Sequence, residues 1–251
     1  MGEVFQRHFH DWQRFSLVGL GAVLAQVAGG IVAWLLGLLA LGGSAGASAL
    51  SMYAVGGGDG LGLVVTVIAA MGGAAVVMLV AWLVVGGLVR AGLVGAIVAY
   101  RRGEDVGFAT FWSYATRYAG KMVLLGLIYG VILLVSAVVV IFPLIGQIVY
   151  LLWLPTAFVT LGIYPAYLII HDGYGVVSAV KQGLRILERQ TGQTVLGGLI
   201  MALFYLAGSL LCAVPIVNIV GALFVAILGQ PLVYYFFVER FESEVRPQVI
   251  W

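Results

Sequence analysis

The sequence predicts an all-α membrane protein, a polytopic helical bundle whose six transmembrane helices form three hairpins joined by interfacial amphipathic linker helices. Three observations predict this class. Of the 251 residues, 63% are hydrophobic and 9% are charged, whereas an average soluble domain carries about 25% charge. Six apolar stretches are long enough to cross a bilayer, which takes about 20 residues each. All 12 Lys and Arg residues fall on segments that alternate spanning places on one side.

The six apolar stretches are residues 15–41, 61–88, 122–142, 148–170, 194–214 and 219–238. Barrel strands would alternate apolar and polar residues, whereas residues 131–135 and 137–141 are apolar at every position, as lipid-embedded helices are. The first two stretches exceed the minimum, so we expect them to tilt or to extend beyond the membrane. The first is also too long for a signal-peptide core of about 7–15 residues, and we expect it to be a retained span.

The basic residues predict the orientation. They lie at positions 7 and 14, 90 to 121, 181 to 189, and 240 and 246. The opposite connections, residues 42–60 and tight turns at 143–146 and 215–218, contain no Lys or Arg. The positive-inside rule therefore predicts cytoplasmic N- and C-termini, cytoplasmic polar connections and three external hairpin tips.

A threefold pattern recurs within one membrane domain that covers residues 1–251, with pseudo-repeats at about 4–100, 107–170 and 175–240. The leader GFATFWSYATRYAGK at 107–121 and the leader GVVSAVKQGLRILER at 175–189 each precede a hairpin and end in two cations spaced i, i+4. Pro165 and Pro231 occupy similar late positions in the closing spans. The alternative is that any two apolar hairpins resemble each other.

The leader at 175–190 is amphipathic at helical spacing, which predicts a helix lying on the membrane. One side carries Val176, Val177, Val180, Gly183, Leu184 and Leu187, and the other carries Lys181, Arg185, Glu188 and Arg189. Asp172 is placed to cap its first turn. The cations that we expect to meet anionic lipid headgroups are Lys181, Arg185, Arg189, Arg117 and Lys121. The alternative role for these cations is snorkelling and topology marking.

The centres of the six stretches contain no Asp, Glu, Lys, Arg or His, the residues that coupled transporters generally place within the bilayer. We expect the polar residues there to make interhelical or back-bonded hydrogen bonds. Gln26, Thr160 and Gln230 are the groups best placed to line a polar pathway, if spans one, four and six meet. Pro155, Pro165 and Pro231 either kink their spans for packing or break them at a transport site.

Small residues at spacing four predict close helix approach, either in a tight bundle or at a dimer face. They are Gly21, Ala25 and Gly29; Gly87, Ala91 and Gly95; Gly126 and Gly130; and Gly198 and Ala202.

The sequence contains no established enzymatic, metal or cofactor motif. His8, His10, Asp11, His171 and Asp172 have no metal-ligand spacing, and we expect neutral interfacial histidines. Cys212 is the single cysteine and suits a small packing residue. A net charge of +2 provides no concentrated basic surface, so we expect no nucleic-acid partner.

Two short segments carry a family resemblance. LVRAGLV at 88–94, followed by Arg102, Gly103, Glu104 and Phe108, resembles the first link in uncharacterised bacterial six-helix membrane proteins. Some of these are related to the membrane domain fused to glycerophosphodiester phosphodiesterases. Asp172 and Gly173, followed by SAVK at 178–181, resemble the second link, although Gly183 stands where that group often has serine. The resemblance implies a bacterial cytoplasmic-membrane module without assigned chemistry, and the phosphodiesterase domain itself is absent.

These observations favour a non-enzymatic scaffold, assembly factor or accessory subunit that contacts membrane lipids and either a protein partner or a second copy of the chain. The alternative is a permease or channel-like component for a small or lipidic solute. A continuous polar cavity at mid-membrane would favour transport, and a dry, closed bundle would favour the scaffold.

Overall fold

The computed structural model describes residues 11–55, 60–213 and 218–249. Within these residues all regular secondary structure is helical. Six helices in this part of the chain are long and apolar enough to cross a membrane: Gln13–Gly43, Met71–Arg101, Phe108–Ile141, Ile145–His171, Thr191–Leu210 and Gly221–Val245. The predicted all-α class and its six apolar helices are therefore confirmed. Most of the expected leader at 4–14 and of the expected turn at 215–218 lies outside the described residues.

The contacts divide the chain into two compact units. One is Ala25–Gly86, and the other comprises the described residues within Met1–Leu24 and Gly87–Trp251. We call them the hairpin unit and the bundle unit. Helices α2 (Trp12–Val55) and α3 (Gly60–Arg101) each contribute residues to both units.

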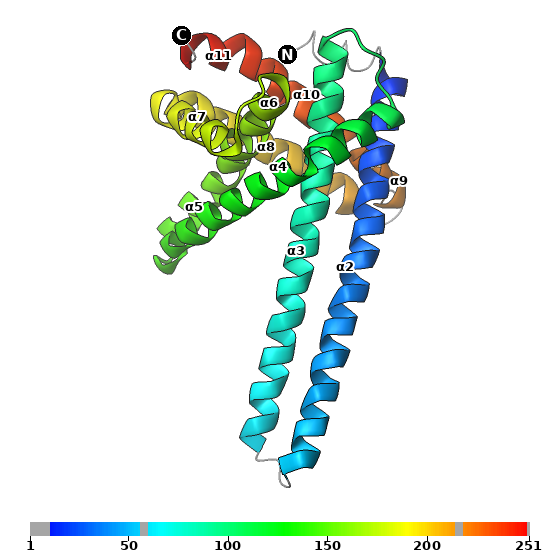
Figure 1. The fold of residues 1–251 in the computed structure, drawn as a ribbon. Coiled ribbons are helices and arrows are strands. Elements are labelled where there is room, and N and C mark those ends of the chain that lie inside the picture. The colour runs from blue at the N-terminus through cyan, green and yellow to red at the C-terminus, as the bar shows by residue number, and fades with distance from the viewer. Residues whose placement is uncertain (1–10, 56–59, 214–217, 250–251) are drawn as a thin grey trace. The chain divides into compact units, whose positions relative to one another are not determined.

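The hairpin unit pairs α2 with α3, which run side by side in Figure 1. Small residues on α2 make the contact: Gly29 lies against Val85 and Gly37 against Met78. Ala25, one turn before Gly29, and Ala33, between Gly29 and Gly37, are buried as well, so the predicted small-residue stripe continues for two more turns. Most described large apolar side chains of this unit are exposed, as expected for helices surrounded by lipid.

The bundle unit contains the remaining helices (Figure 1). In chain order they are α4 (Phe108–Ser136), a 3₁₀ turn η1 (Ala137–Ile141), α5 (Ile145–Ala157), η2 (Phe158–Ile163), α6 (Tyr164–His171), α7 (Val176–Arg189), α8 (Thr191–Ala213), α9 (Asn218–Phe224), η3 (Val225–Gly229), α10 (Gln230–Arg240), η4 (Phe241–Val245) and α11 (Arg246–Val249).

Glycine allows α3 to approach α4 closely in the bundle unit. A Cβ atom at Gly92 would overlap the ring of Phe111, and one at Gly95 would overlap Tyr114. Gly87 packs in the same way against Val123. Of the two predicted uses of small residues, the structure shows intramolecular packing at this stripe.

Three segments of the bundle unit are π-helical, and a proline explains each of them. The residue before each proline donates its backbone N–H to the carbonyl five residues earlier: Tyr164 to Val159, Gln230 to Val225 and Arg246 to Phe241. Proline has no N–H, and its ring clashes with the carbonyl four residues earlier, so the preceding turn widens. Pro165 and Pro231 thus alter their spans as expected, whereas Pro155 lies inside α5 without a break.

Two of these widened turns receive a glycine from another helix. Gly183 of α7 lies against the Thr160 carbonyl of η2, and Gly19 of α2 lies against the Ile227 carbonyl of η3. A π pattern would pair the Thr160 carbonyl with residue 165, and an α pattern would pair the Ile227 carbonyl with residue 231, but both residues are prolines and have no N–H. Only a residue without a Cβ fits so close to the backbone.

The hairpin between η1 and α5 confirms the tight turn predicted at 143–146. Ile145 donates its N–H to the Pro143 carbonyl at 2.9 Å. Leu144 between them has φ 64° and ψ −66°, a γ-turn that is strained for an L-residue. Gly146 follows, and its Cα packs against the Val139 carbonyl.

The predicted polar connections are wrong in extent. Helix α2 continues to Val55, so most of residues 42–60 is helical. Helix α3 continues through Arg90 to Arg101, and α4 begins at Phe108, which reduces the expected connection at 90–121 to a short loop. The expected separate leader at 107–121 is the first half of α4, because nothing interrupts backbone hydrogen bonding at Lys121. Apolar runs end at charged residues, but helices do not.

The contact of Gly183 with Thr160 yields a stability prediction. Gly183→Ala is expected to lower the free energy of unfolding by about 1–3 kcal/mol, because the added methyl group forces α7 away from η2. Gly120→Ala on α4 is the matched control, since Gly120 faces open space. It should be neutral or stabilising by up to about 1 kcal/mol. Thermal unfolding of detergent-purified protein, followed by circular dichroism, measures both. Equal shifts in the two variants would contradict the packing argument.

Candidate functional site

Helix α7 has a buried face and an exposed face. Val176, Ala179, Val180, Gln182, Gly183 and Ile186 are buried against the bundle. The sequence assigned Val177 and Leu184 to the apolar side, but their residues are 58% and 41% exposed. The buried side is centred on Gly183, where α7 packs against the Thr160 carbonyl of η2. This orientation places Val177 and Leu184 at the edge of the exposed face.

The exposed face of α7 combines cations with apolar side chains. Lys181, Arg185 and Arg189 are all exposed. Among the described residues none of the three makes an ion pair. We call Val177, Lys181, Leu184, Arg185 and Arg189 the α7 surface. Free cations beside exposed apolar groups are typical of helices that lie at a lipid headgroup layer.

Arg117 and Lys121, the other predicted headgroup contacts, are exposed on α4. The Arg117 guanidinium carbon lies 5.6 Å from the ring centroid of Tyr118, and the Lys121 ammonium lies 5.8 Å from it. Tyr118 also stacks on Tyr114. An aromatic ring thus holds this pair of cations, and α7 has no counterpart of it.

The three residues of the predicted polar pathway are in different settings. Thr160 is fully buried in η2, and its hydroxyl donates to the Thr156 carbonyl at 2.8 Å. Gln230 is half-buried at the start of α10. Gln26 belongs to the hairpin unit. The Thr160 hydroxyl is therefore engaged by its own helix, which is the back-bonding that the sequence favoured.

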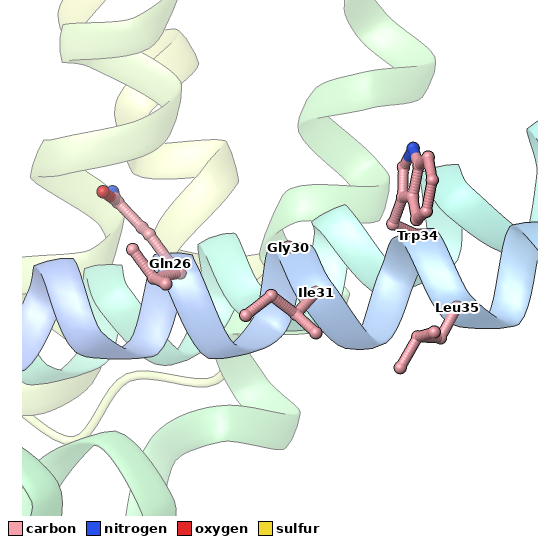
Figure 2. A pocket seen from close by; sticks show the side chains of 6 residues that line it. Gln26, Gly30, Ile31, Trp34 and Leu35 are labelled. Carbon is pink, nitrogen blue, oxygen red and sulfur yellow. The ribbon is translucent and has the colours of Figure 1, made fainter.

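Gln26 borders a shallow groove on α2. The groove is lined by Gln26, Val27, Gly30, Ile31, Trp34 and Leu35. Figure 2 shows the side chains of Gln26 and Trp34 on either side of Gly30, which faces open space. All lining residues come from one helix, so this is an open surface feature, and it encloses no site.

A network of charges joins the end of α6 to the C-terminal helices. Asp172 accepts from Arg246 at 3.0 Å, and its same oxygen lies 2.6 Å from His171 Nδ1. Arg246 also pairs with Glu242. Burial lowers the pKa of Arg246, but the hydrogen bonds and charges of Glu242 and Asp172 outweigh it and hold the pKa above its ordinary value. The predicted capping role of Asp172 is wrong, because Gly175 is the cap residue of α7.

Arg90 is a buried cation that the sequence placed in a connection. It lies on α3 within the candidate span Met71–Arg101 and is 9% exposed. Its Nε and Nη1 atoms are buried without a hydrogen-bond partner. This corrects the expectation that the spans carry no ionisable residue away from their ends. The missed signal was the apolar run at 91–99, which continues the same helix beyond the arginine.

Aromatic side chains from three helical segments surround Arg90. Its guanidinium carbon lies 5.9 Å from the ring centroid of Tyr129 on α4 and 5.8 Å from that of Phe158 in η2. The Tyr234 hydroxyl on α10 interacts with the guanidinium. Gly162 leaves room beside it, since a Cβ there would lie 3.9 Å from the guanidinium carbon.

These contacts do not offset the cost of burying the charge. No carboxylate within the described chain pairs with Arg90. An unpaired buried ion costs several kcal/mol even after relaxation, and each cation–π contact returns only about 0.5–2 kcal/mol. An arginine side chain keeps its charge in proteins. The Arg90 cluster, which we define as Arg90, Tyr129, Phe158, Tyr205 and Tyr234, is therefore short of negative charge.

A second buried arginine, Arg240 on α10, shows the contrast. Its Nε donates to Glu244 at 3.0 Å, and its Nη2 donates to the Gln193 carbonyl at 2.9 Å. Gly197 leaves space for the remaining Nη1. Arg240 thus has a counter-charge and helps to hold α8 against α10, whereas none of the described carboxylates pairs with Arg90.

The structure brings no metal site together, since no group of three or more His, Cys, Asp or Glu side chains in the described residues could hold an ion. Comparison with models of known protein families, with curated proteins and with solved structures gives no match. The resemblance to the bacterial six-helix membrane proteins therefore stays a prediction. The α7 surface and the Arg90 cluster are therefore the two features of the protein from which we infer its function.

Proposed function

We propose that the protein is a non-enzymatic scaffold, assembly factor or accessory subunit of the bacterial cytoplasmic membrane, which contacts anionic lipid and a protein partner. The α7 surface is the observation that carries this proposal. It presents three cations that form no ion pair with any residue the structure describes, next to two exposed apolar side chains. The other face of α7 is packed against the bundle. Lipid bound to the α7 surface would therefore hold the whole bundle unit at the membrane.

The expected strength of this contact follows from its charge. Each cation near an anionic membrane surface contributes about 1 kcal/mol. Val177 and Leu184 add apolar contact at the level of the acyl-chain boundary. The cationic part is screened by salt, and the apolar part is not. Three cations together support a preference for anionic over neutral lipid.

The orientation with both termini cytoplasmic belongs to the same proposal. Arg101 and Glu239 form an ion pair, as do Asp172 and Arg246, so the charged ends of α3, α6 and α10 gather at one end of the bundle unit. The positive-inside rule places such an end in the cytoplasm. The α7 surface would then meet the inner leaflet, whose lipids carry the negative charge.

The organisation as three hairpins with linker helices is supported by the two widened turns. Both η2 and η3 end two residues before a proline, at corresponding places in the second and third proposed repeats. Each also receives a glycine of another helix. For the protein partner, the open Gly30 groove lets another helix approach α2 closely.

The second candidate function is a permease or channel-like component for a small or lipidic solute. The buried, unpaired Arg90 favours it, because charged residues inside membrane spans commonly mark solute pathways. Against it, Thr160 is bonded to its own helix. The scaffold remains the function that the geometry supports best.

The orientation is tested by reporter fusions after Trp251. A reporter active only in the cytoplasm should give a signal at this position, and a reporter active only outside the membrane should not, because the charged end of the bundle resists translocation. Fusions within residues 56–59 are the matched control and should behave in the opposite way. External signal after Trp251 would refute the orientation and the inner-leaflet contact of α7.

The lipid contact is tested by replacing Lys181, Arg185 and Arg189 together with Gln. Anionic lipid retained in native mass spectrometry should fall markedly, because about 3 kcal/mol of surface attraction is removed. Glu188→Gln, on the same exposed face, is the control and should retain at least as much lipid. Unchanged retention in the triple variant would leave only snorkelling and topology marking.

The two candidate functions differ in transport. Purified protein in liposomes should show no proton- or sodium-driven uptake. Gln26→Leu and Gln230→Leu should leave folding largely intact, because interhelical hydrogen bonds in membranes average only about 0.6 kcal/mol. Thr160→Val should do the same, because the lost hydroxyl bonds to its own helix. Thr160 takes Val because its site is fully buried and has no room for Leu. Gradient-driven flux that these variants abolish without unfolding would establish the permease instead.

A further inference from the structure

The Arg90 cluster has the composition of an anion site. Nε and Nη1 of Arg90 carry three N–H donors, and both atoms are buried without a partner in the described chain. Aromatic faces of Tyr129 and Phe158 flank the guanidinium and stabilise the cation, but they accept no hydrogen bond in its plane. The donors that would bind an anion are thus still available.

Tyrosine hydroxyls add further donors around the same point. The Tyr129 ring on α4 lies 5.9 Å from the guanidinium carbon, and the Tyr234 hydroxyl on α10 interacts with the guanidinium. Tyr205 on α8 is a third tyrosine that interacts electrostatically with Arg90. Phenol groups donate hydrogen bonds and bring no negative charge of their own. The cluster therefore offers donors and a positive charge, and the described part of the chain supplies it with no anionic acceptor.

Tyr205 is the member of the Arg90 cluster that reaches the surface of the bundle unit. Its side chain is on the outside of α8, with the residue 58% exposed, and Leu203 and Leu206 beside it are 63% and 57% exposed. These apolar neighbours indicate a lipid-facing surface. Arg90 precedes Arg101 by 11 residues, about 17 Å along α3 at about 1.5 Å per residue. A phosphate bound at Arg90 would therefore lie within the candidate span Met71–Arg101.

We propose that the Arg90 cluster binds a phosphate group, which enters past Tyr205 and accepts hydrogen bonds from the Arg90 guanidinium and the surrounding tyrosine hydroxyls. Phosphate fits better than a carboxylate because its several oxygens match donors that converge from three helices. The group comes either from a phospholipid headgroup or from free phosphate. This site is independent of the α7 surface, so either can fail without the other.

The experiment uses full-length protein, delipidated in detergent, and measures the melting temperature. One arm adds inorganic phosphate, and the second adds phosphatidylglycerol, with diacylglycerol as the phosphate-free lipid. Wild type should be stabilised by phosphatidylglycerol and not by diacylglycerol. Stabilisation by inorganic phosphate as well would identify free phosphate as a ligand, and its absence would assign the site to lipid.

Arg90→Met is the decisive variant, since methionine fills a similar volume without charge. Its apparent affinity for the stabilising ligand should fall by at least about tenfold, the effect of losing one charge-assisted contact. Arg102→Met is the matched control, because Arg102 is an exposed arginine directly after α3 with no assigned lipid contact, and it should respond like wild type. Equal responses of wild type and Arg90→Met to both ligands would overturn the proposal. The ligands would then bind without Arg90, and the aromatic rings alone would accommodate the buried cation.

Tyr129→Phe and Tyr205→Phe keep the test decisive if Arg90→Met does not fold. Each removes one hydroxyl and leaves the ring in place. Each should weaken the ligand response several-fold without changing the melting temperature of the ligand-free protein. Undiminished ligand responses in both tyrosine variants would refute the site, and so would the absence of any response of wild type to either phosphate source.

Discussion

Close backbone approach at glycine is the constraint on which the rest of this structure depends. Because both the interior and the exterior of the chain are apolar, burial of hydrophobic surface does little to select one helix pair over another. Contact with a carbonyl or a ring does select, since it requires the absence of a side chain. Gly19, Gly92 and Gly183 each make such a contact. The positions of α2, α3 and α7 in the bundle unit follow from these three points.

The widened turns make this selection specific. A proline removes a helical donor and expands the turn before it, and the exposed carbonyl then lies at a defined place on the helix surface. Gly183 meets such a turn in η2, and Phe158 at the start of the same segment contacts Arg90. One six-residue segment thereby positions both the helix that carries the α7 surface and one wall of the Arg90 cluster.

The sequence predicted the presence of the helices well, because composition alone decides it. It predicted helix ends and buried faces less well, because charge and packing compete there. Long apolar runs predicted six helices, because the bilayer demands them. The same reasoning ended the second span at Leu88 and placed Arg90 in a connection, since a run of apolar residues stops at a charge but a helix does not. Periodicity found the amphipathic character of α7. It misassigned Val177 and Leu184, because the direction of the buried face depends on where Gly183 meets η2.

Leu144 at the hairpin tip reveals how that turn is determined. Its backbone angles are the mirror image of the relaxed γ-turn of an L-residue, and so they match the preferred shape of a D-residue. The conformation therefore runs against the chirality of leucine itself. The helices on either side, η1 and α5, impose it by bringing Gly146 against the Val139 carbonyl. The handedness of this turn is thus set by the surrounding hairpin, and Leu144 adopts it against its own conformational preference.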